Sequence, residues 1–142
     1  MRVVVAEDSY LIREGLRLLL ATQDDIELVA AVSSLPELEA AVAEHTPDVV
    51  VTDVRMPPGG RDEGIVAAER FARTHPRMGM VVLSQHVEPE WALRLFDAGA
   101  AGRAYLLKER IGDVDQLRHA LQEVMSGGTC STLSWSKRSS GP

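Results

Sequence analysis

Five polar residues of this chain stand at or directly after short apolar runs, and their side chains suit chemistry on a phosphoryl group. They are three carboxylates, one hydroxyl and one ammonium group, namely Glu7, Asp8, Asp53, Ser84 and Lys108. Carboxylates held close together repel one another, and their pKa values rise unless a cation lies among them. Mg²⁺ favours a few carboxylate oxygens with water and phosphate oxygens, and a nearby lysine and hydroxyl suit the remaining phosphoryl oxygens.

The same set of residues indicates a nucleophile and a metal. A carboxylate that the metal does not need in full can attack phosphorus and form an acyl phosphate. The set therefore predicts phosphoryl transfer onto an aspartate, with Mg²⁺ or Mn²⁺ as the cofactor. A zinc site is not expected, because Cys130 is the only cysteine and neither C-x-x-C nor H-E-x-x-H occurs. The four histidines lie on different predicted elements and form no metal set: His45, His75, His86 and His119.

These residues can act together only if the fold brings them together, and the apolar runs predict that it does. Four runs are rich in valine or leucine without polar alternation, which is typical of strands buried on both faces of a parallel sheet. They span Arg2 to Ala6, Asp48 to Thr52, Met80 to Leu83 and Ala104 to Leu107. A fifth run, Ile26 to Val32, carries Glu27 and is expected nearer an edge. Ligands of such sheets bind beyond the carboxyl ends of the strands, so the polar residues should share one rim.

Apolar residues at three-and-four spacing predict five helices between and after these strands. The helices span Tyr10 to Thr22, Pro36 to His45, Glu63 to Thr74, Pro89 to Ala98 and Val114 to Met125. Ser34 is an N-cap signal, Pro89 suits a first helical turn, and Gly127 follows the last helix as a stop signal. Five βα units in succession predict an α/β fold, a doubly wound parallel sheet with right-handed crossovers.

The same spacing predicts which helix faces are apolar. The first helix presents Leu11, Ile12, Gly15, Leu16, Leu19 and Leu20, and the last presents Val114, Leu117, Leu121, Val124 and Met125. In the fourth helix, Trp91 and Phe96 are expected to pack in or beside the core, whereas an exposed Trp91 would favour a partner surface.

The overall composition predicts one compact acidic domain. The chain has 142 residues, of which 45% are apolar and 25% charged, and its net charge is −6. Such a charge repels nucleic acid and anionic membranes, so the chain alone is expected to be a poor DNA binder. The longest apolar runs are far shorter than the ~20 residues that span a bilayer, and Glu7 and Asp8 follow the first run too soon for a signal peptide. A cytoplasmic location is therefore expected.

Four motifs stand in order along residues 2 to about 126. They are Glu7-Asp8, Asp53-Val54-Arg55-Met56-Pro57, Val81-Val82-Leu83-Ser84, and Gly99-Ala100-Ala101-Gly102 leading to Tyr105-Leu106-Leu107-Lys108. Together they resemble the receiver domain of bacterial two-component response regulators. The Tyr-Leu-Leu-Lys ending and the Leu-Ser-Gln-His segment at 83–86 are most similar to NarL/LuxR-type regulators, whose receiver precedes a helix-turn-helix output domain. The resemblance implies a flavodoxin-like receiver over residues 1–126, with a five-stranded sheet in the order 2-1-3-4-5 flanked by five helices.

The resemblance also implies a role for each acidic residue. Asp53 would be the phosphoacceptor, and Glu7 and Asp8 would bind Mg²⁺ together with Asp53 and the backbone carbonyl of Arg55. The donor would be a partner histidine kinase or a small phosphodonor. The protein would be a signalling switch, not an enzyme that turns over a substrate.

The remaining matches imply how the switch is read out. Ser84 would hydrogen-bond the phosphoryl group, Lys108 would pair with it, and Tyr105 would turn inward when Ser84 is drawn toward the phosphate. That movement would alter the surface of the fourth helix, fifth strand and fifth helix. A homodimer is expected through helices four and five or through helices one and five. DNA would be bound only through an output domain in a longer form that controls transcription, and no membrane contact is expected.

The sequence departs from the family pattern at several positions. Glu109 stands where many receivers have proline, so a cis peptide bond there loses its usual cause. Gln85 stands where the family commonly has a small residue, and its side chain can crowd the phosphate. Arg55 and His86 occupy the two positions thought to set the lifetime of the phosphoryl group. Both side chains are bulky, so we expect them to obstruct in-line water and to slow phosphoryl loss.

Two other functions fit part of the pattern. An aspartyl-phosphate hydrolase shares the nucleophile, but it needs a second acid two residues after that nucleophile, where this chain has Arg55. A phosphorylation-independent interaction module would use the fourth and fifth helices and leave the acidic rim without a role. The complete set of five polar residues favours the receiver over both.

Residues 127–142 differ in composition from the rest of the chain. They begin with Gly127-Gly128, are rich in serine, and show neither a helical nor a strand period, which predicts an irregular tail. The chain could be a stand-alone receiver, a deliberately shortened regulator or a frameshifted product. With permitted codons, a one-base shift over residues 129–141 can encode a segment that resembles the linker helix of the family.

Overall fold

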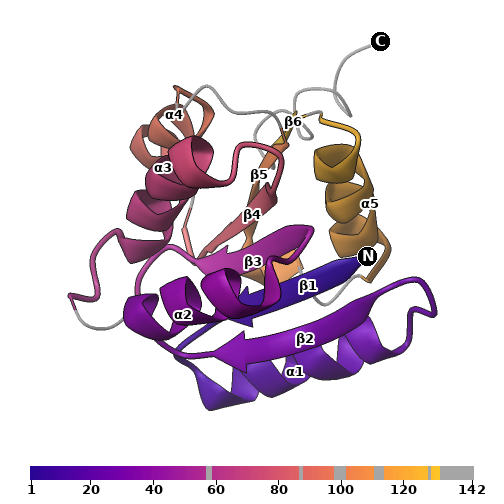
Figure 1. Cartoon of the computed structure of the whole chain (residues 1–142). Coiled ribbons are helices and arrows are strands. Elements are labelled where there is room, and N and C mark those ends of the chain that lie inside the picture. The colour runs from indigo at the N-terminus through magenta and orange to yellow at the C-terminus, as the bar shows by residue number, and fades with distance from the viewer. Residues whose placement is uncertain (57–58, 87, 98–101, 111–113, 128, 132–142) are drawn as a thin grey trace, which may run out of the picture.

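A computed structural model describes residues 1–56, 59–86, 88–97, 102–110, 114–127 and 129–131. Strands and helices alternate along the chain (Figure 1). Their bounds are β1 (Arg2–Ala6), α1 (Tyr10–Ala21), β2 (Glu27–Val32), α2 (Leu35–His45), β3 (Val49–Asp53), α3 (Glu63–Thr74), β4 (Gly79–Ser84), α4 (Pro89–Asp97), β5 (Arg103–Leu107), the 3-10 turn η1 (Lys108–Arg110), α5 (Val114–Met125) and β6 (Thr129–Ser131). All five predicted strands and all five predicted helices are present, with their ends shifted by no more than a residue or so.

The strands form one sheet in the order β2-β1-β3-β4-β5-β6, and every neighbouring pair is parallel. The predicted order 2-1-3-4-5 is therefore confirmed, with β2 at an edge as its glutamate suggested. Ala6 pairs with Thr52, Asp53 with Leu83, and Ser84 with Leu107. Because these pairs lie in register, the carboxyl ends of the central strands finish at one edge of the sheet.

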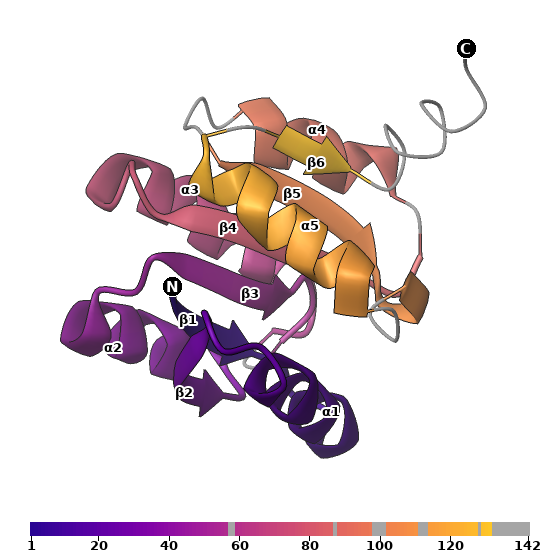
Figure 2. The ribbon, with the colours of Figure 1, turned by 90° about the vertical axis from the view of Figure 1, so that its right-hand side faces the viewer.

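The sixth strand lies within the segment that was expected to be irregular. Thr129–Ser131 pairs with the backbone of β5 from Arg103 to Tyr105 (Figure 2). The physical reason is that α5 returns the chain beside β5, whose edge offers unpaired N–H and C=O groups, and such edges accept a further strand. Residues 132–142, including most of the frameshift segment, lie outside the described residues.

Two helical layers cover the sheet. In Figure 2, α1 and α5 lie on the face toward the viewer, where Leu16 and Leu20 of α1 and Leu117 of α5 pack on β1, β3, β4 and β5. The other face carries α2, α3 and α4, which contribute Leu38, Phe71 and other buried side chains. Burial on both faces explains why the central strands contain runs of valine with no polar alternation.

Local signals set the helix ends where the sequence indicated. The Ser34 hydroxyl accepts a hydrogen bond from the Glu37 N–H at 3.3 Å, so the predicted N-cap of α2 is confirmed. Helix α4 begins at Pro89, and Gly127 follows α5 with a positive φ of 85°. None of the helices in the described part of the chain combines the length and apolar character that crossing a membrane requires.

Two apolar side chains predicted for helix core faces are exposed instead. Leu11 of α1 is 81% exposed and Met125 of α5 is 45% exposed. Each helix contacts the sheet through only one narrow stripe, so an apolar residue beside that stripe or at the last turn stays in water. Trp91 and Phe96 of α4 are half-buried against the core, as expected.

Candidate functional site

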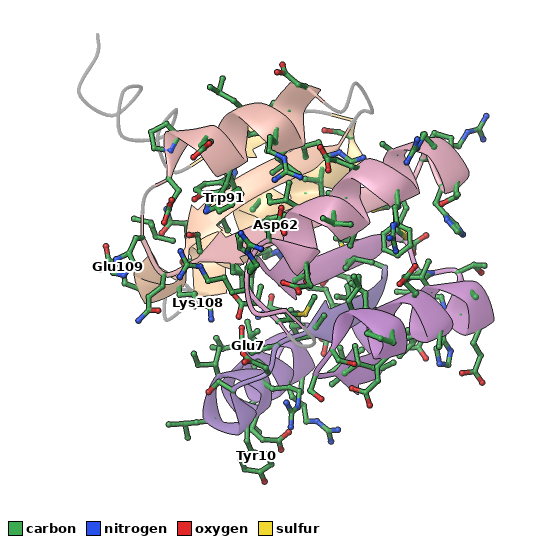
Figure 3. All side chains as sticks on the ribbon, turned by 90° about the vertical axis from the view of Figure 1, so that its left-hand side faces the viewer. Glu7, Tyr10, Asp62, Trp91, Lys108 and Glu109 are labelled. Carbon is green, nitrogen blue, oxygen red and sulfur yellow. The ribbon has the colours of Figure 1, made fainter. Side chains whose placement is uncertain are left out.

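The five polar residues singled out in the sequence lie together at the carboxyl edge of the sheet. Asp53 and Ser84 are the last residues of β3 and β4, while Glu7, Asp8 and Lys108 directly follow β1 and β5. Figure 3 shows Glu7 and Lys108 approaching each other from these separate strands. Residues 101 positions apart in the chain thus meet at one rim.

The three carboxylates form one cluster. Glu7, Asp8 and Asp53 each offer an oxygen within 4.8 Å of the others, and Glu7 and Asp53 are buried whereas Asp8 is exposed. The cluster opens into a pocket of about 230 Å³. Its lining includes Asp8, Asp53, Val54, Arg55, Ser84, Gln85, His86, Glu88 and Lys108. The pocket is therefore polar and open to water on the side of Asp8.

Lys108 supplies the positive charge of the cluster. Its Nζ lies 3.1 Å from Oε1 of Glu7 and 3.0 Å from Oδ2 of Asp53, and its side chain is 16% exposed. Burial lowers the pKa of Lys108, but the hydrogen bonds and charges of Asp53 and Glu7 outweigh burial and raise it. The ammonium group therefore stays charged and bridges the two buried acids.

The acids themselves carry an electrostatic cost. The pKa of Glu7 is raised to about 7, mainly by burial and to a smaller extent by the charge of Asp53. The charge and hydrogen bond of Lys108 lower this pKa, but by less. Burial also raises the pKa of Asp53, while Lys108 and the backbone N–H of Arg55 act in the opposite direction. Burial is thus the main cost for both acids, and Lys108 offsets only part of it.

This site fits a hard divalent cation. Oε2 of Glu7 is buried and has no hydrogen-bond partner among the described residues. Such an orphaned acceptor is costly unless a cation or donor satisfies it. Three carboxylate oxygens beside an open, polar pocket match the oxygen ligands and retained water that Mg²⁺ prefers.

A serine and a tyrosine hydroxyl meet on one backbone carbonyl beside the pocket. Oγ of Ser84 donates to the carbonyl of His86 at 2.6 Å, and Oη of Tyr105 donates to the same carbonyl at 3.3 Å. The N–H of Glu88 donates back to Oη of Tyr105 at 3.2 Å. Tyr105 is completely buried, so its side chain occupies the inward position. The segment between β4 and α4 is thereby tied to both hydroxyls.

The two residues predicted to tune the phosphoryl lifetime line the mouth of this pocket. Arg55 and His86 are exposed, as is Gln85. Nη2 of Arg55 lies 3.4 Å from Oε1 of Glu88, a half-buried residue that sequence reasoning missed. No sequence signal identified Glu88, because its partner lies 33 positions away.

A second missed residue, Glu63, follows strand β3 at the start of α3. Glu63 is buried and accepts hydrogen bonds from the backbone N–H groups of Gly59 and Arg61. Sequence reasoning used Glu63 only as the first residue of a helix. The available signal was a glutamate at a helix start preceded closely by Gly59-Gly60, a pattern that suits a carboxylate enclosed by backbone N–H groups.

A doubly wound sheet in this strand order, with a lysine-paired aspartate at its carboxyl edge, defines the class of signalling receiver domains. The model of the response regulator receiver domain matches residues 3–122, and the chain belongs to this family. The strand order and the position of the acidic cluster agree with that assignment.

The relatives specify the type of regulator. The oxygen regulatory protein NreC of Staphylococcus epidermidis is 32% identical over 129 residues, which cover 91% of this chain and 56% of NreC. The chain thus spans about half the length of the curated relatives it matches.

Solved structures give the same result. A LuxR-family two-component response regulator from Aurantimonas is 26% identical, with a TM-score of 0.76 over 91% of this chain and 87% of that one. The signal receiver domain of the putative response regulator NarL from Mycobacterium tuberculosis is 30% identical, with a TM-score of 0.69 over 85% and 95%. The chain is the receiver domain of a NarL/LuxR-type response regulator, as its motifs indicated.

Proposed function

We propose that Asp53 accepts a phosphoryl group from a sensor histidine kinase or a small phosphodonor in a reaction that depends on Mg²⁺ or Mn²⁺. The observation that carries this proposal is the contact of Asp53 with Lys108 at 3.0 Å inside the acidic cluster. A carboxylate oxygen of Asp53 attacks phosphorus, the bond from phosphorus to the donor breaks, and the donor leaves with the bonding electron pair.

Each neighbouring residue has a part in this step. Glu7, Asp8, Asp53 and the backbone carbonyl of Arg55 would hold the cation, which neutralises the negative charge of the transferred group. Lys108 pairs with a phosphoryl oxygen in the transition state and with the acyl phosphate afterward. Asp8 faces the open side of the pocket, where a donor can enter.

Ser84 and Tyr105 convert the modification into a change of surface. The hydroxyl of Ser84 has one proton to donate, and the phosphoryl group competes for it with the carbonyl of His86. Tyr105 already donates to this carbonyl from its inward position, and it keeps that hydrogen bond when Ser84 turns to the phosphoryl group. The His86 carbonyl loses its hydrogen bond from Ser84, and this loss alters the surface formed by α4, β5 and α5. The altered surface changes self-association, which uses either α4 and α5 or α1 and α5.

Two residues at the pocket mouth slow the loss of the phosphoryl group. Arg55 and His86 obstruct the line along which water attacks phosphorus, and Glu88 restrains Arg55 at 3.4 Å. The chain therefore catalyses only its own phosphorylation and a slow dephosphorylation. A phosphate hydrolase is disfavoured, because the position two residues after Asp53 is basic.

In a longer form, this receiver controls DNA binding and transcription through an output domain. The net charge of −6 makes the receiver a poor DNA binder, so contact with DNA belongs to the output domain. A cytoplasmic location, where a kinase and Mg²⁺ are available, is part of the same proposal.

The test is the intact mass of the chain after incubation with Mg²⁺ and a small acyl phosphate. We expect a gain of one phosphoryl mass in the parent, and no gain in Asp53→Asn or in the parent with a chelator. No gain in the folded parent would overturn the proposal and favour a phosphorylation-independent interaction module. A gain retained in Asp53→Asn would assign the acceptor to another residue.

A further inference from the structure

The loop between β3 and α3 encloses the carboxylate of Glu63. The N–H of Gly59 donates to Oε2 at 2.6 Å, and the N–H of Arg61 donates to Oε1 at 2.8 Å. Each oxygen of this buried carboxylate therefore accepts a hydrogen bond from the backbone that precedes α3. The loop matters because it directly follows the phosphoacceptor Asp53 and includes the predicted metal-ligating carbonyl of Arg55.

Close packing fixes this carboxylate relative to Asp53. A Cβ at Gly59 would lie 2.4 Å from Oε2 of Glu63, and a Cβ at Gly64 would lie 2.0 Å from the backbone oxygen of Asp53. Gly64 thus needs glycine for its close approach to backbone, whereas a Cβ at Gly59 would displace the Glu63 carboxylate from its place. The N–H of Gly64 also donates to the carbonyl of Val54 at 2.8 Å. The first turn of α3 consequently lies directly against the end of β3.

The charge on Glu63 is set by its backbone donors. Burial raises the pKa of Glu63, but the N–H groups of Arg61, Glu63 itself, Gly59 and Met56 outweigh burial and lower it. The carboxylate is therefore ionised at neutral pH.

The peptide group between Arg55 and Met56 is flanked by two hydrogen bonds to the turn that Glu63 holds. The N–H of Gly64 donates to the carbonyl of Val54, and the N–H of Gly60 donates to the carbonyl of Met56, each at 2.8 Å. Gly60 stands between Gly59 and Arg61, whose N–H groups both donate to Glu63. Glu63 therefore holds the turn that fixes this peptide, and Arg55 and Asp53 line the pocket beside it.

We propose that Glu63 is a positioning residue that fixes the Arg55–Met56 peptide through this turn, and with it the Arg55 carbonyl as a ligand of a divalent cation bound beside Asp53. This inference rests on the proposed function, because it concerns the same metal site. Groups that support a metal ligand from behind typically change metal affinity by about 10- to 100-fold when removed.

The experiment compares the metal affinity of two variants, each of which loses a glutamate carboxylate that accepts hydrogen bonds at the start of a helix. Glu37 accepts hydrogen bonds from the N–H and hydroxyl of Ser33 and from the hydroxyl of Ser34 at the start of α2, and neither serine lines the pocket. We would titrate the parent, Glu63→Gln and Glu37→Gln with Mg²⁺ and with Mn²⁺ by calorimetry, and record thermal unfolding of each. We expect about 10- to 100-fold weaker binding in Glu63→Gln and unchanged binding in Glu37→Gln.

The outcomes separate the two proposals. A Glu63→Gln variant that binds the metal as tightly as a metal-binding parent would overturn the positioning role and leave the proposed function intact. A folded parent that binds neither metal would overturn both. If Glu63→Gln is unfolded at the measuring temperature, Glu63→Asp replaces it, because it keeps the charge on a shorter side chain. Weaker metal binding in folded Glu63→Asp would support the inference, and parent-like binding would overturn it.

Discussion

The two ends of β5 hold cations in opposite circumstances, a half-buried lysine and a buried arginine. Lys108, just past the carboxyl end, contacts two carboxylates at 3.0 and 3.1 Å. Arg103, at the amino end, is 1% exposed, and within the described part of the chain its guanidinium donates to one acceptor, the carbonyl of Ala68 at 3.3 Å. Its Nε and Nη1 have no hydrogen-bond partner among the described residues. One strand thus carries a compensated charge and an uncompensated one.

The difference shows that only the cation at the carboxyl end of β5 has acidic partners that offset its burial. Acidic partners raise the pKa of Lys108 despite burial, whereas burial alone lowers the pKa of Arg103 to about 10. At the carboxyl edge the charges form the site that we propose binds a cation and accepts the phosphoryl group. At the amino end the guanidinium fills space between the sheet and α3, and its desolvation is a cost to stability.

Replacing Lys108 should have the largest effect. In Lys108→Met, the two buried carboxylates lose their cation, and the transition state loses a positioned positive charge. We expect the rate of phosphoryl incorporation, followed by intact mass, to fall by about 10²- to 10³-fold.

Arg103→Met is the matched control for that experiment, because it removes a buried cation from the other end of the same strand. Its phosphorylation rate should stay close to that of the parent. Equal losses of rate in both variants would show that the two ends of β5 do not differ in function.

The same Arg103→Met variant should be more stable than the parent. Replacing an unpaired buried charge with an apolar side chain of similar length removes a desolvation cost, so the free energy of unfolding should rise by about 1 to 4 kcal/mol. Urea unfolding monitored by circular dichroism measures it. A loss of stability would mean that Arg103 has a compensating partner, and the comparison above would then be wrong.

The metal-free protein should lose stability as pH rises, because the folded-state pKa of Glu7 is raised from 4.5 to about 7. Between these values the unfolded chain releases a proton that the folded chain retains, so the free energy of unfolding falls as pH increases. We expect a decrease on the order of 2 kcal/mol from this group between pH 4.5 and 7, in urea unfolding with a chelator present.

Two comparisons check that assignment. Glu7→Gln should flatten this part of the pH profile, and Mg²⁺ should reduce the loss in the parent by stabilising the ionised carboxylates. A profile that keeps its slope in Glu7→Gln would assign the titration to another group.

Removing one hydroxyl in the middle of β5 should have the smallest effect. Tyr105→Phe loses a donor to the carbonyl of His86 and the acceptor for the N–H of Glu88. Ser84 still satisfies that carbonyl, so we expect a loss of about 1 kcal/mol in thermal unfolding. Tyr10→Phe is the control, because Tyr10 is 70% exposed on α1 and should leave stability unchanged. Equal losses in the two variants would contradict this account.

Much of the architecture followed from local patterns. Valine-rich strands such as β3 contain no polar alternation, which indicates burial on both faces, and alternation with helices then leaves few topologies. The short strand β6 was not foreseen, because its pairing depends on where α5 delivers the chain. The exposure of Leu11 was missed for a similar reason, since a periodic pattern does not show how wide a stripe the sheet can cover.

The sequence by itself determined the residue types of the site and the rim on which they stand. Glu7, Asp8 and Asp53 stand after predicted strands, and the carboxyl ends of parallel strands lie at the same edge of a sheet. Only the tertiary structure decided that Lys108 bridges two acids, that Glu63 holds the loop behind Asp53, and that Arg103 has one backbone acceptor. These facts depend on distances between residues far apart in the chain, and burial and pKa follow from those distances and not from residue order.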